Sequence, residues 1–259
     1  MDLGISGRKA IVCASSRGLG RGCAFALAQA GCEVIVNGRD GKTLEATAAE
    51  LRQATGAKVT AVLADVATPE GQAALLAACP EPDILVNNNA GPPFRDFREL
   101  ARQQMIDGVI ANMVVAIELT QKVIDSMCAK QFGRIVNITS GSVKMPLVGL
   151  DLSSGARAGL TAFLAGVARS VAGSNVTINF LLPGAFDTER LASNVALNAK
   201  KRGISIEEAR KERMAGVPAK RFGTPEEFGA ACAFLCSAQA GYITGQSLLI
   251  DGGVYPGVL

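Results

Sequence analysis

The sequence predicts an α/β fold in which a doubly wound parallel sheet lies between two layers of helices (α/β/α). Short apolar runs rich in β-branched residues alternate along the chain with longer, Ala-rich segments of helical periodicity. The chain has 259 residues, 49% of them hydrophobic, which is enough for one large core without disulfides or metals. Because no linker interrupts the pattern, we expect residues 1–259 to form a single domain.

The expected elements follow in a regular order. Right-handed crossovers between parallel strands would place the intervening helices on both faces of the sheet. The expected strands are Lys9–Cys13, Glu33–Asn37, Lys58–Leu63, Asp83–Asn87, Gly133–Thr139, Val176–Leu182 and Ser247–Asp251. The clearest helical segments are Gly18–Ala30, Gly41–Thr55, Leu100–Lys130 and Ser154–Ala172.

Composition excludes several classes of protein. The 26 basic and 23 acidic side chains are scattered, so we expect no nucleic-acid partner. No apolar run is long enough to span a membrane, and the segment from Met1 to Lys9 lacks the apolar stretch of a signal peptide. Seven cysteines without a C-x-x-C pair favour a reduced, cytoplasmic protein. The absence of histidine excludes Ser-His-Asp hydrolysis and most His-bearing zinc sites, and we expect no bound metal.

The first strand is followed by a glycine-containing turn that opens a helix. Residues 13–20 read Cys-Ala-Ser-Ser-Arg-Gly-Leu-Gly. Such a turn lets the backbone approach a pyrophosphate, and the helix start offers unpaired N–H groups to it. Ala14 stands where a first glycine is usual, so by itself the segment also fits an ordinary strand-to-helix turn.

Further polar groups follow the other strands, at the sheet edge where open α/β folds bind ligands. Asp65 follows the third strand and is a candidate for holding an adenine amino group. Asn88–Gly91 follows the fourth strand, and Ser140 the fifth. Pro183 and Gly184 follow the sixth, with Thr188 four residues after that glycine.

These motifs resemble those of the short-chain dehydrogenase/reductase family, which includes the 3-oxoacyl-carrier-protein reductases. The resemblance runs nearly end to end and includes Arg221–Glu227 and Ile243–Gly253 near the C-terminus. It implies a Rossmann-type fold, a nicotinamide coenzyme and a carbonyl or alcohol substrate. The coenzyme residues that it implies are Ser15, Ser16, Arg17, Gly18, Leu19, Gly20, Asp65, Val66, Asn89, Ala90, Gly91, Arg157, Pro183, Gly184 and Thr188.

The end of the second strand bears on which coenzyme is used. A carboxylate there would hold the ribose 2′-OH of NAD, whereas a positive charge would accept the 2′-phosphate of NADP. The family's acidic position falls on Gly38, and Arg39 follows it, while Arg17 adds a second guanidinium. We therefore expect NADP, with NAD possible. Asp40 argues for NAD unless it only caps the next helix.

The resemblance breaks at the catalytic positions. In the family a Tyr passes the proton, a Ser holds the substrate oxygen, a Lys assists the Tyr, and an Asn supports a chain of water molecules. Asn112 and Ser140 match, but the Tyr and Lys positions fall on Ser153 and Arg157. A serine hydroxyl is far less acidic than a phenol, and arginine stays protonated. Losing a positioned general acid costs on the order of 10²–10⁴ in rate.

Few residues are candidates to replace that tyrosine. Lys144 follows Ser140 by four residues and is a candidate catalytic or substrate-binding group, with a solvated loop lysine as the alternative. We expect Tyr242 to be structural, and Tyr255 to reach a site only through subunit exchange. Residues 187–216 are expected to form a helical lid over the substrate, although a solvated insertion has the same pattern.

The resemblance also implies a homodimer or homotetramer formed through the helices of residues 100–130 and 154–172, although ordinary packing on the sheet is the alternative. The expected function is an NADP-dependent oxidoreductase with a non-standard proton donor. Two alternatives are open: a coenzyme-binding pseudoenzyme, and non-redox chemistry such as dehydration in the same pocket. The sequence does not identify the substrate.

Overall fold

A computed structural model describes residues 2–257 and confirms the predicted fold class. Seven parallel strands form one sheet in the order β3-β2-β1-β4-β5-β6-β7, so the strand order reverses between β1 and β4. The strands are β1 (Lys9–Val12), β2 (Glu33–Gly38), β3 (Val59–Leu63), β4 (Ile84–Asn87), β5 (Gly133–Ile138), β6 (Val176–Pro183) and β7 (Ser247–Ile250).

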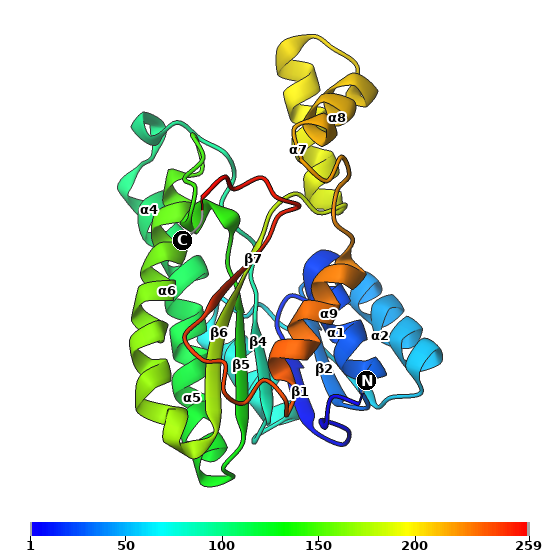
Figure 1. Cartoon of the computed structure of the whole chain (residues 1–259), viewed down its shortest axis with the longest axis vertical. Helices are drawn as coiled ribbons and strands as arrows, with labels where there is room; N and C mark the ends of the chain where they lie inside the picture. The colour runs from blue at the N-terminus through cyan, green and yellow to red at the C-terminus, as the bar shows by residue number, and fades with distance from the viewer. Residues whose placement is uncertain (1, 258–259) are drawn as a thin grey trace.

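Helices cover both faces of this sheet (Figure 1). One layer contains α1, α2 and α9, and the other contains α4, α5 and α6. The helices are α1 (Gly18–Gln29), α2 (Gly41–Thr55), α3 (Pro69–Ala78), α4 (Arg102–Val109), α5 (Val115–Ala129), α6 (Asp151–Val171), α7 (Glu189–Arg202), α8 (Ile206–Ala215) and α9 (Pro225–Cys236).

The sheet is buried on both faces, which explains why its strands are continuous apolar runs. Alternate residues of β1 belong to different cores: Val12 packs with α1 and α9, whereas Ile11 packs with α5 and α6. The central strands β4 and β5 are buried over their whole length. This rigid centre fixes the positions of the loops that leave the carboxyl ends of the strands. No helix within residues 2–257 is long and apolar enough to cross a membrane.

The single long helix expected over Leu100–Lys130 is not uniform. It begins at Arg102 and contains a π-helical turn, Ile110–Val114, between α4 and α5. Single π turns interrupt the regular hydrogen-bond ladder and occur frequently at functional sites. Asn112 lies in this turn and is buried, so the irregularity coincides with a predicted site residue.

Helices α7 and α8 project beyond the carboxyl edge of the sheet (Figure 1). Thr188 caps α7 and Ser205 caps α8, each accepting a hydrogen bond from a first-turn amide. The two helices share a small apolar core of their own that includes Leu191, Val195 and Ala209. The predicted insertion of residues 187–216 is thus a helical hairpin with its own packing.

Candidate active site

The main cleft lies at the carboxyl edge of the sheet and has a volume of about 1020 Å³. This is at the upper end of the range for small-molecule sites, which is about 300–1,000 Å³. Most of the predicted site residues line it together. They are Ser16, Arg17, Gly18, Leu19, Arg39, Asp65, Val66, Asn89, Ala90, Ser140, Ser153, Arg157, Pro183, Gly184 and Thr188.

The glycine-containing turn is held in a tight conformation. Ala14, at the position where a glycine is usual, has φ +45°, in the left-handed region. Its amide donates to Asn37 Oδ1 at 3.1 Å, and its carbonyl accepts from Asn88 Nδ2 at 3.1 Å. A Cβ on Gly20 would lie 2.5 Å from the Ala14 carbonyl oxygen, so only glycine permits this approach of turn and helix.

The start of α1 fits a phosphate group. Arg17 is the N-cap residue, and its side chain accepts no hydrogen bond from the first-turn amides, unlike the caps of α2, α3, α7, α8 and α9. Amides at a helix start carry partial positive charge and bind anions. Ser16, Gly18 and Leu19 bring this end of α1 to the cleft.

Several predicted residues do not line the main cleft. The Ser15 hydroxyl is buried, donating to the Val12 carbonyl and accepting from the Asn37 amide, so it supports the turn. Gly20 is packed against Ala14, and Gly91 is covered by the Arg190 guanidinium. Lys144 is also outside the lining, which does not support its predicted contact with substrate.

Two basic side chains, Arg39 and Arg17, lie near the end of β2, where the coenzyme ribose is expected. Gly38 carries no carboxylate, and a Cβ there would lie 2.8 Å from Ser16 Oγ. Arg39 is within 3.5 Å of Asp65, and Arg17 within 2.8 Å of Glu189; all four side chains are exposed. Asp40 accepts a hydrogen bond from the Thr43 amide at 2.8 Å and caps α2. This is the helix-cap role that the sequence analysis gave as the alternative to NAD binding.

The expected chemical centre combines two pairs of side chains. Ser142 Oγ donates to Ser140 Oγ at 2.9 Å. Arg157 Nε donates to Ser153 Oγ at 3.3 Å, and its Nη1 donates to the Ile138 carbonyl at 2.7 Å. Burial, followed by the nearby charge of Arg190, lowers the pKa of Arg157 to about 10. Arg157 therefore keeps its positive charge at neutral pH.

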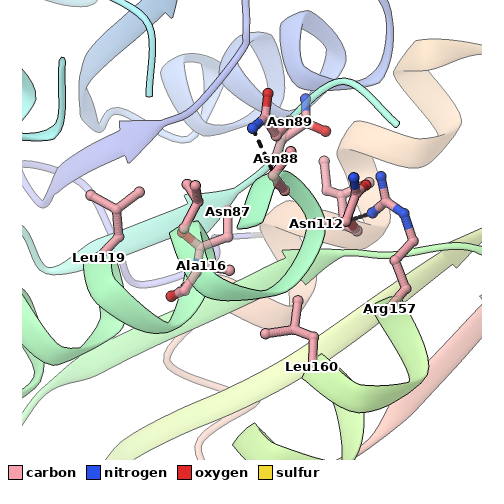
Figure 2. A pocket seen from close by; sticks show the side chains of 11 residues that line it. Asn87, Asn88, Asn89, Asn112, Ala116, Leu119, Arg157 and Leu160 are labelled. Carbon is pink, nitrogen blue, oxygen red and sulfur yellow. Dashed lines mark hydrogen bonds between the residues drawn. The ribbon is translucent and has the colours of Figure 1, made fainter. Parts of the chain in front are cut away.

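Asn112 lies behind this centre, in a small cavity of about 20 Å³ that Arg157 also lines (Figure 2). Its Nδ2 donates to the Gly108 carbonyl at 3.1 Å, whereas its Oδ1 is buried and accepts no hydrogen bond from residues 2–257. The volume suits a single water molecule, which would satisfy this acceptor. Asn112 is thus next to the chemical centre, as its match to the family motif implies.

The prediction for Tyr255 is wrong in one respect: it reaches the cleft within its own chain, without subunit exchange. The segment after β7 turns back because Asp251 accepts hydrogen bonds from the amides of Gly253 and Tyr255. The Lys144 ammonium lies 5.8 Å from the Tyr255 ring centroid. Tyr242 is fully exposed on the surface.

The cleft lining also includes Arg190 and Arg213, which sequence reasoning placed in the expected lid of residues 187–216 but did not single out. Of these two arginines, Arg190 could have been found from the sequence, because it follows Thr188 by two residues and so lies in the first turn of a capped helix. Nothing in the sequence around Arg213 indicates its position. No three Cys, Asp or Glu side chains in the described part of the chain are placed to hold a metal ion.

Comparison with known proteins identifies the family. The model of the family described as enoyl-(acyl carrier protein) reductase matches residues 13–255. The chain is 32% identical to the 3-oxoacyl-[acyl-carrier-protein] reductase FabG of Vibrio cholerae, over 98% of this chain and 99% of the relative. The chain belongs to the short-chain dehydrogenase/reductase family.

The chain is also similar to two NADPH-linked reductases. The NADPH-dependent reductase BacG of Bacillus subtilis is 30% identical, over 96% of this chain and 98% of its own. The structure of L-sorbose reductase from Gluconobacter frateurii, complexed with NADPH and L-sorbose, has a TM-score of 0.94 and 28% identity, with all of both chains covered. The departure from the family pattern at Ser153 and Arg157 stays a prediction from the sequence motif.

Proposed function

We propose that the protein is an NADPH-dependent reductase that converts a carbonyl compound into an alcohol with a non-standard proton donor. One observation carries the proposal: the phosphate-binding start of α1, the basic end of β2 and the Ser140, Ser153 and Arg157 side chains line one continuous cleft. The similarity to NADPH-dependent reductases supports it. The chain is an oxidoreductase of the short-chain type, with NADP as its coenzyme.

The chain's own residues fit this coenzyme. The start of α1 would hold the pyrophosphate, and Asp65 and Val66 would flank the adenine. Arg17 and Arg39 would hold the 2′-phosphate, since their present ion pairs are exposed and such pairs contribute only about 0–1 kcal/mol. When bound, NADPH supplies the hydride for the reaction.

The serines and Arg157 would act on the substrate oxygen. The hydroxyls of Ser140 and Ser153, which line the cleft, would hold it, and the positive charge of Arg157 would stabilise the negative charge that develops there. Ser140 gives its proton to this oxygen and receives one from Ser142, whose hydroxyl is 2.9 Å away. Water in the cleft restores the Ser142 proton, so each turnover consumes one proton from solvent.

A coenzyme-absorbance assay over a panel of ketones and aldehydes tests the function. Oxidation of NADPH that depends on the added carbonyl compound supports it. Tight NADPH binding without any oxidation indicates a pseudoenzyme, and loss of substrate without a change in NADPH indicates non-redox chemistry. A tenfold or greater preference for NAD over NADP would overturn the coenzyme assignment.

The proton route has its own test. We expect Ser142→Ala to lower kcat at least tenfold while leaving NADPH affinity unchanged. Exposed Ser170, whose hydroxyl bonds only within α6, provides the matched Ser170→Ala control. If Ser142→Ala keeps full activity and Tyr255→Phe loses it, the serine relay is refuted and the donor is the Tyr255 phenol.

We also propose that α4 and α6 form a subunit interface in a homodimer or homotetramer. Met105 and Ile106 of α4 are 42% and 40% exposed, and Phe163 of α6 is 48% exposed. Light scattering coupled to size exclusion should give a dimer or tetramer, and Phe163→Glu should yield monomers. A monomeric wild-type chain would refute this assembly. The seven unpaired cysteines are consistent with a reducing compartment, and the cytoplasmic location stays a prediction.

We further propose that α7 and α8 act as the lid predicted for residues 187–216. The inner face of α7 brings Arg190, Ser193 and Asn194 to the cleft, and α8 brings Arg213. If the hairpin closes over bound ligands, its amides should exchange hydrogen more slowly with NADPH and substrate present than in the free chain. Equal exchange in both states would contradict closure.

A further inference from the structure

The lid hairpin presents two arginines to the cleft that have no acidic partner. Arg190 comes from the first turn of α7 and Arg213 from the last turn of α8, and both line the main cleft. Neither forms an ion pair with any Asp or Glu within residues 2–257. By contrast, Arg202 and Arg210 on the same hairpin each pair with a carboxylate, Glu212 and Asp187 respectively.

Arg190 is directed across the cleft toward the segment after β4. Its Nη2 lies 3.4 Å from the Pro92 carbonyl oxygen. A Cβ on Gly91 would be 2.9 Å from the same Nη2 atom, so the absence of a side chain at Gly91 leaves room for the guanidinium. This geometry places a positive charge between the lid and the fixed wall of the cleft.

The four carboxylates that line the cleft each contact a group other than the two lid arginines. Asp65 pairs with Arg39, and Glu189 pairs with Arg17. Asp40 accepts the Thr43 amide, and Asp251 accepts the amides that follow it. The cleft lining therefore contains five arginines and four carboxylates, and none of these carboxylates forms an ion pair with Arg157, Arg190 or Arg213.

The two lid arginines are also partly desolvated. Partial desolvation lowers the pKa of Arg190 and of Arg213, and no carboxylate counteracts the effect at either residue. A ligand with an anionic oxygen group would supply the missing counter-charge. A guanidinium matches carboxylate and phosphate oxygens with paired hydrogen bonds, and a cleft of one sign attracts such ligands from solution.

We infer that the substrate carries an anionic group, a carboxylate or a phosphate, which Arg190 and Arg213 bind while the serines hold the carbonyl oxygen. This inference rests on the proposed function, since it specifies the substrate class of the same site. The phosphates of the coenzyme have their own partners at the start of α1 and at Arg17 and Arg39. The lid arginines are thereby left for the substrate.

Two matched pairs of probes test the inference by calorimetry, with the chain alone and with NADP⁺ bound. One pair is acetoacetate and methyl acetoacetate, and the other is dihydroxyacetone phosphate and dihydroxyacetone. We expect the anionic member of at least one pair to bind at least tenfold more tightly than its neutral partner. The pair that shows the preference distinguishes a carboxylate substrate from a phosphate substrate.

The variant Arg190→Gln/Arg213→Gln should reduce that preference below threefold. The double variant Lys200→Gln/Lys211→Gln removes the same charge from exposed positions of α7 and α8 outside the cleft, and should keep the preference. The inference is overturned if neither anionic probe is preferred, or if the preference survives loss of the arginines. It is also overturned if the arginine variant weakens NADPH binding tenfold with the probe preference unchanged.

Failure of the proposed function gives a different result. It would appear as no NADPH binding, or as no NADPH oxidation with any carbonyl compound. The probe preference is measured on the free chain as well, so it is decided independently of the coenzyme.

Discussion

The substitution Arg157→Met tests how much the buried positive charge contributes to catalysis and how much it lowers the free energy of unfolding. Burial, together with the nearby charge of Arg190, lowers the pKa of Arg157 to about 10, which corresponds to a penalty of about 3 kcal/mol for the charged form in the folded chain. Because the folded-state pKa is the lower one, the penalty is fully present below a pH of about 10 and is relieved only as the pH rises from there toward the ordinary pKa of arginine.

Substitution also removes favourable contacts. The Ile138 carbonyl loses its 2.7 Å hydrogen bond, and Ser153 Oγ loses one of 3.3 Å. Leaving a buried acceptor unsatisfied costs about 1–3 kcal/mol. Because Ser153 lines the cleft, water can replace its lost donor, and only the Ile138 carbonyl incurs this cost, about 2 kcal/mol. Set against the relief of about 3 kcal/mol, we expect Arg157→Met to gain about 1 kcal/mol of unfolding free energy at neutral pH. Its kcat/KM should fall about 10²-fold, or about 3 kcal/mol of barrier, because the charge that stabilises the developing oxyanion is lost.

Urea unfolding at neutral pH, with Arg134→Met as the control, provides the measurement. Arg134 is also a buried arginine, but it makes four hydrogen bonds, to Gly133, Ser237 and twice to Asn175. Its replacement should cost about 3 kcal/mol or more, since several acceptors lose their donor together. A loss of stability in Arg157→Met as large as that in Arg134→Met would refute the reasoning.

Three further predictions concern the turn and the coenzyme site. Ala14→Gly should raise the unfolding free energy by about 1 kcal/mol, because glycine accepts the left-handed φ of +45°, whereas Ala67→Gly, at a loop position without positive φ, should not. Gly20→Ala should lower the free energy of unfolding by at least about 2 kcal/mol, because its Cβ would lie 2.5 Å from the Ala14 oxygen. The control Gly173→Ala, whose Cβ meets nothing within 4 Å, should be tolerated, and equal thermal unfolding temperatures for the two variants would contradict this. Arg39→Gln should weaken NADPH binding about tenfold without changing NADH binding, as measured by fluorescence titration. The control Lys42→Gln, at a neighbouring exposed position, should change the binding of neither coenzyme, and an equal loss of affinity for both coenzymes in Arg39→Gln would argue against a 2′-phosphate contact.

Much of the site was predictable because it lies next to the strands that position it. Ser140 comes two residues after the end of β5 and Pro183 ends β6, and parallel strands bring these ends to one edge. The lining of the cleft by Ser16, Asn89 and Arg157 follows from the same topology. Local spacing also predicted that Asp40 could be a helix cap instead of a coenzyme ligand.

Other residues could not be placed in this way. The inward direction of the Ser15 hydroxyl depends on Asn37, which comes from the neighbouring strand. The reach of Tyr255 into the cleft depends on the turn that Asp251 holds, and the position of Arg213 depends on how α8 packs against α7. The π turn at Asn112 likewise has no periodic signal, because one irregular turn hardly changes the pattern of apolar residues around it.

The sequence by itself determined the layered sheet, the glycine-containing turn after β1 and the identity of the groups at the strand ends, because hydrophobic periodicity and glycine requirements act over a few residues. Tertiary structure alone decided which charges are left without partners. Arg157 and Arg190 are unneutralised, whereas Arg39 and Arg17 are paired, because that outcome depends on carboxylates as far apart in the chain as Arg17 and Glu189. Such pairings arise only when distant segments are folded together, and local spacing holds no information about them.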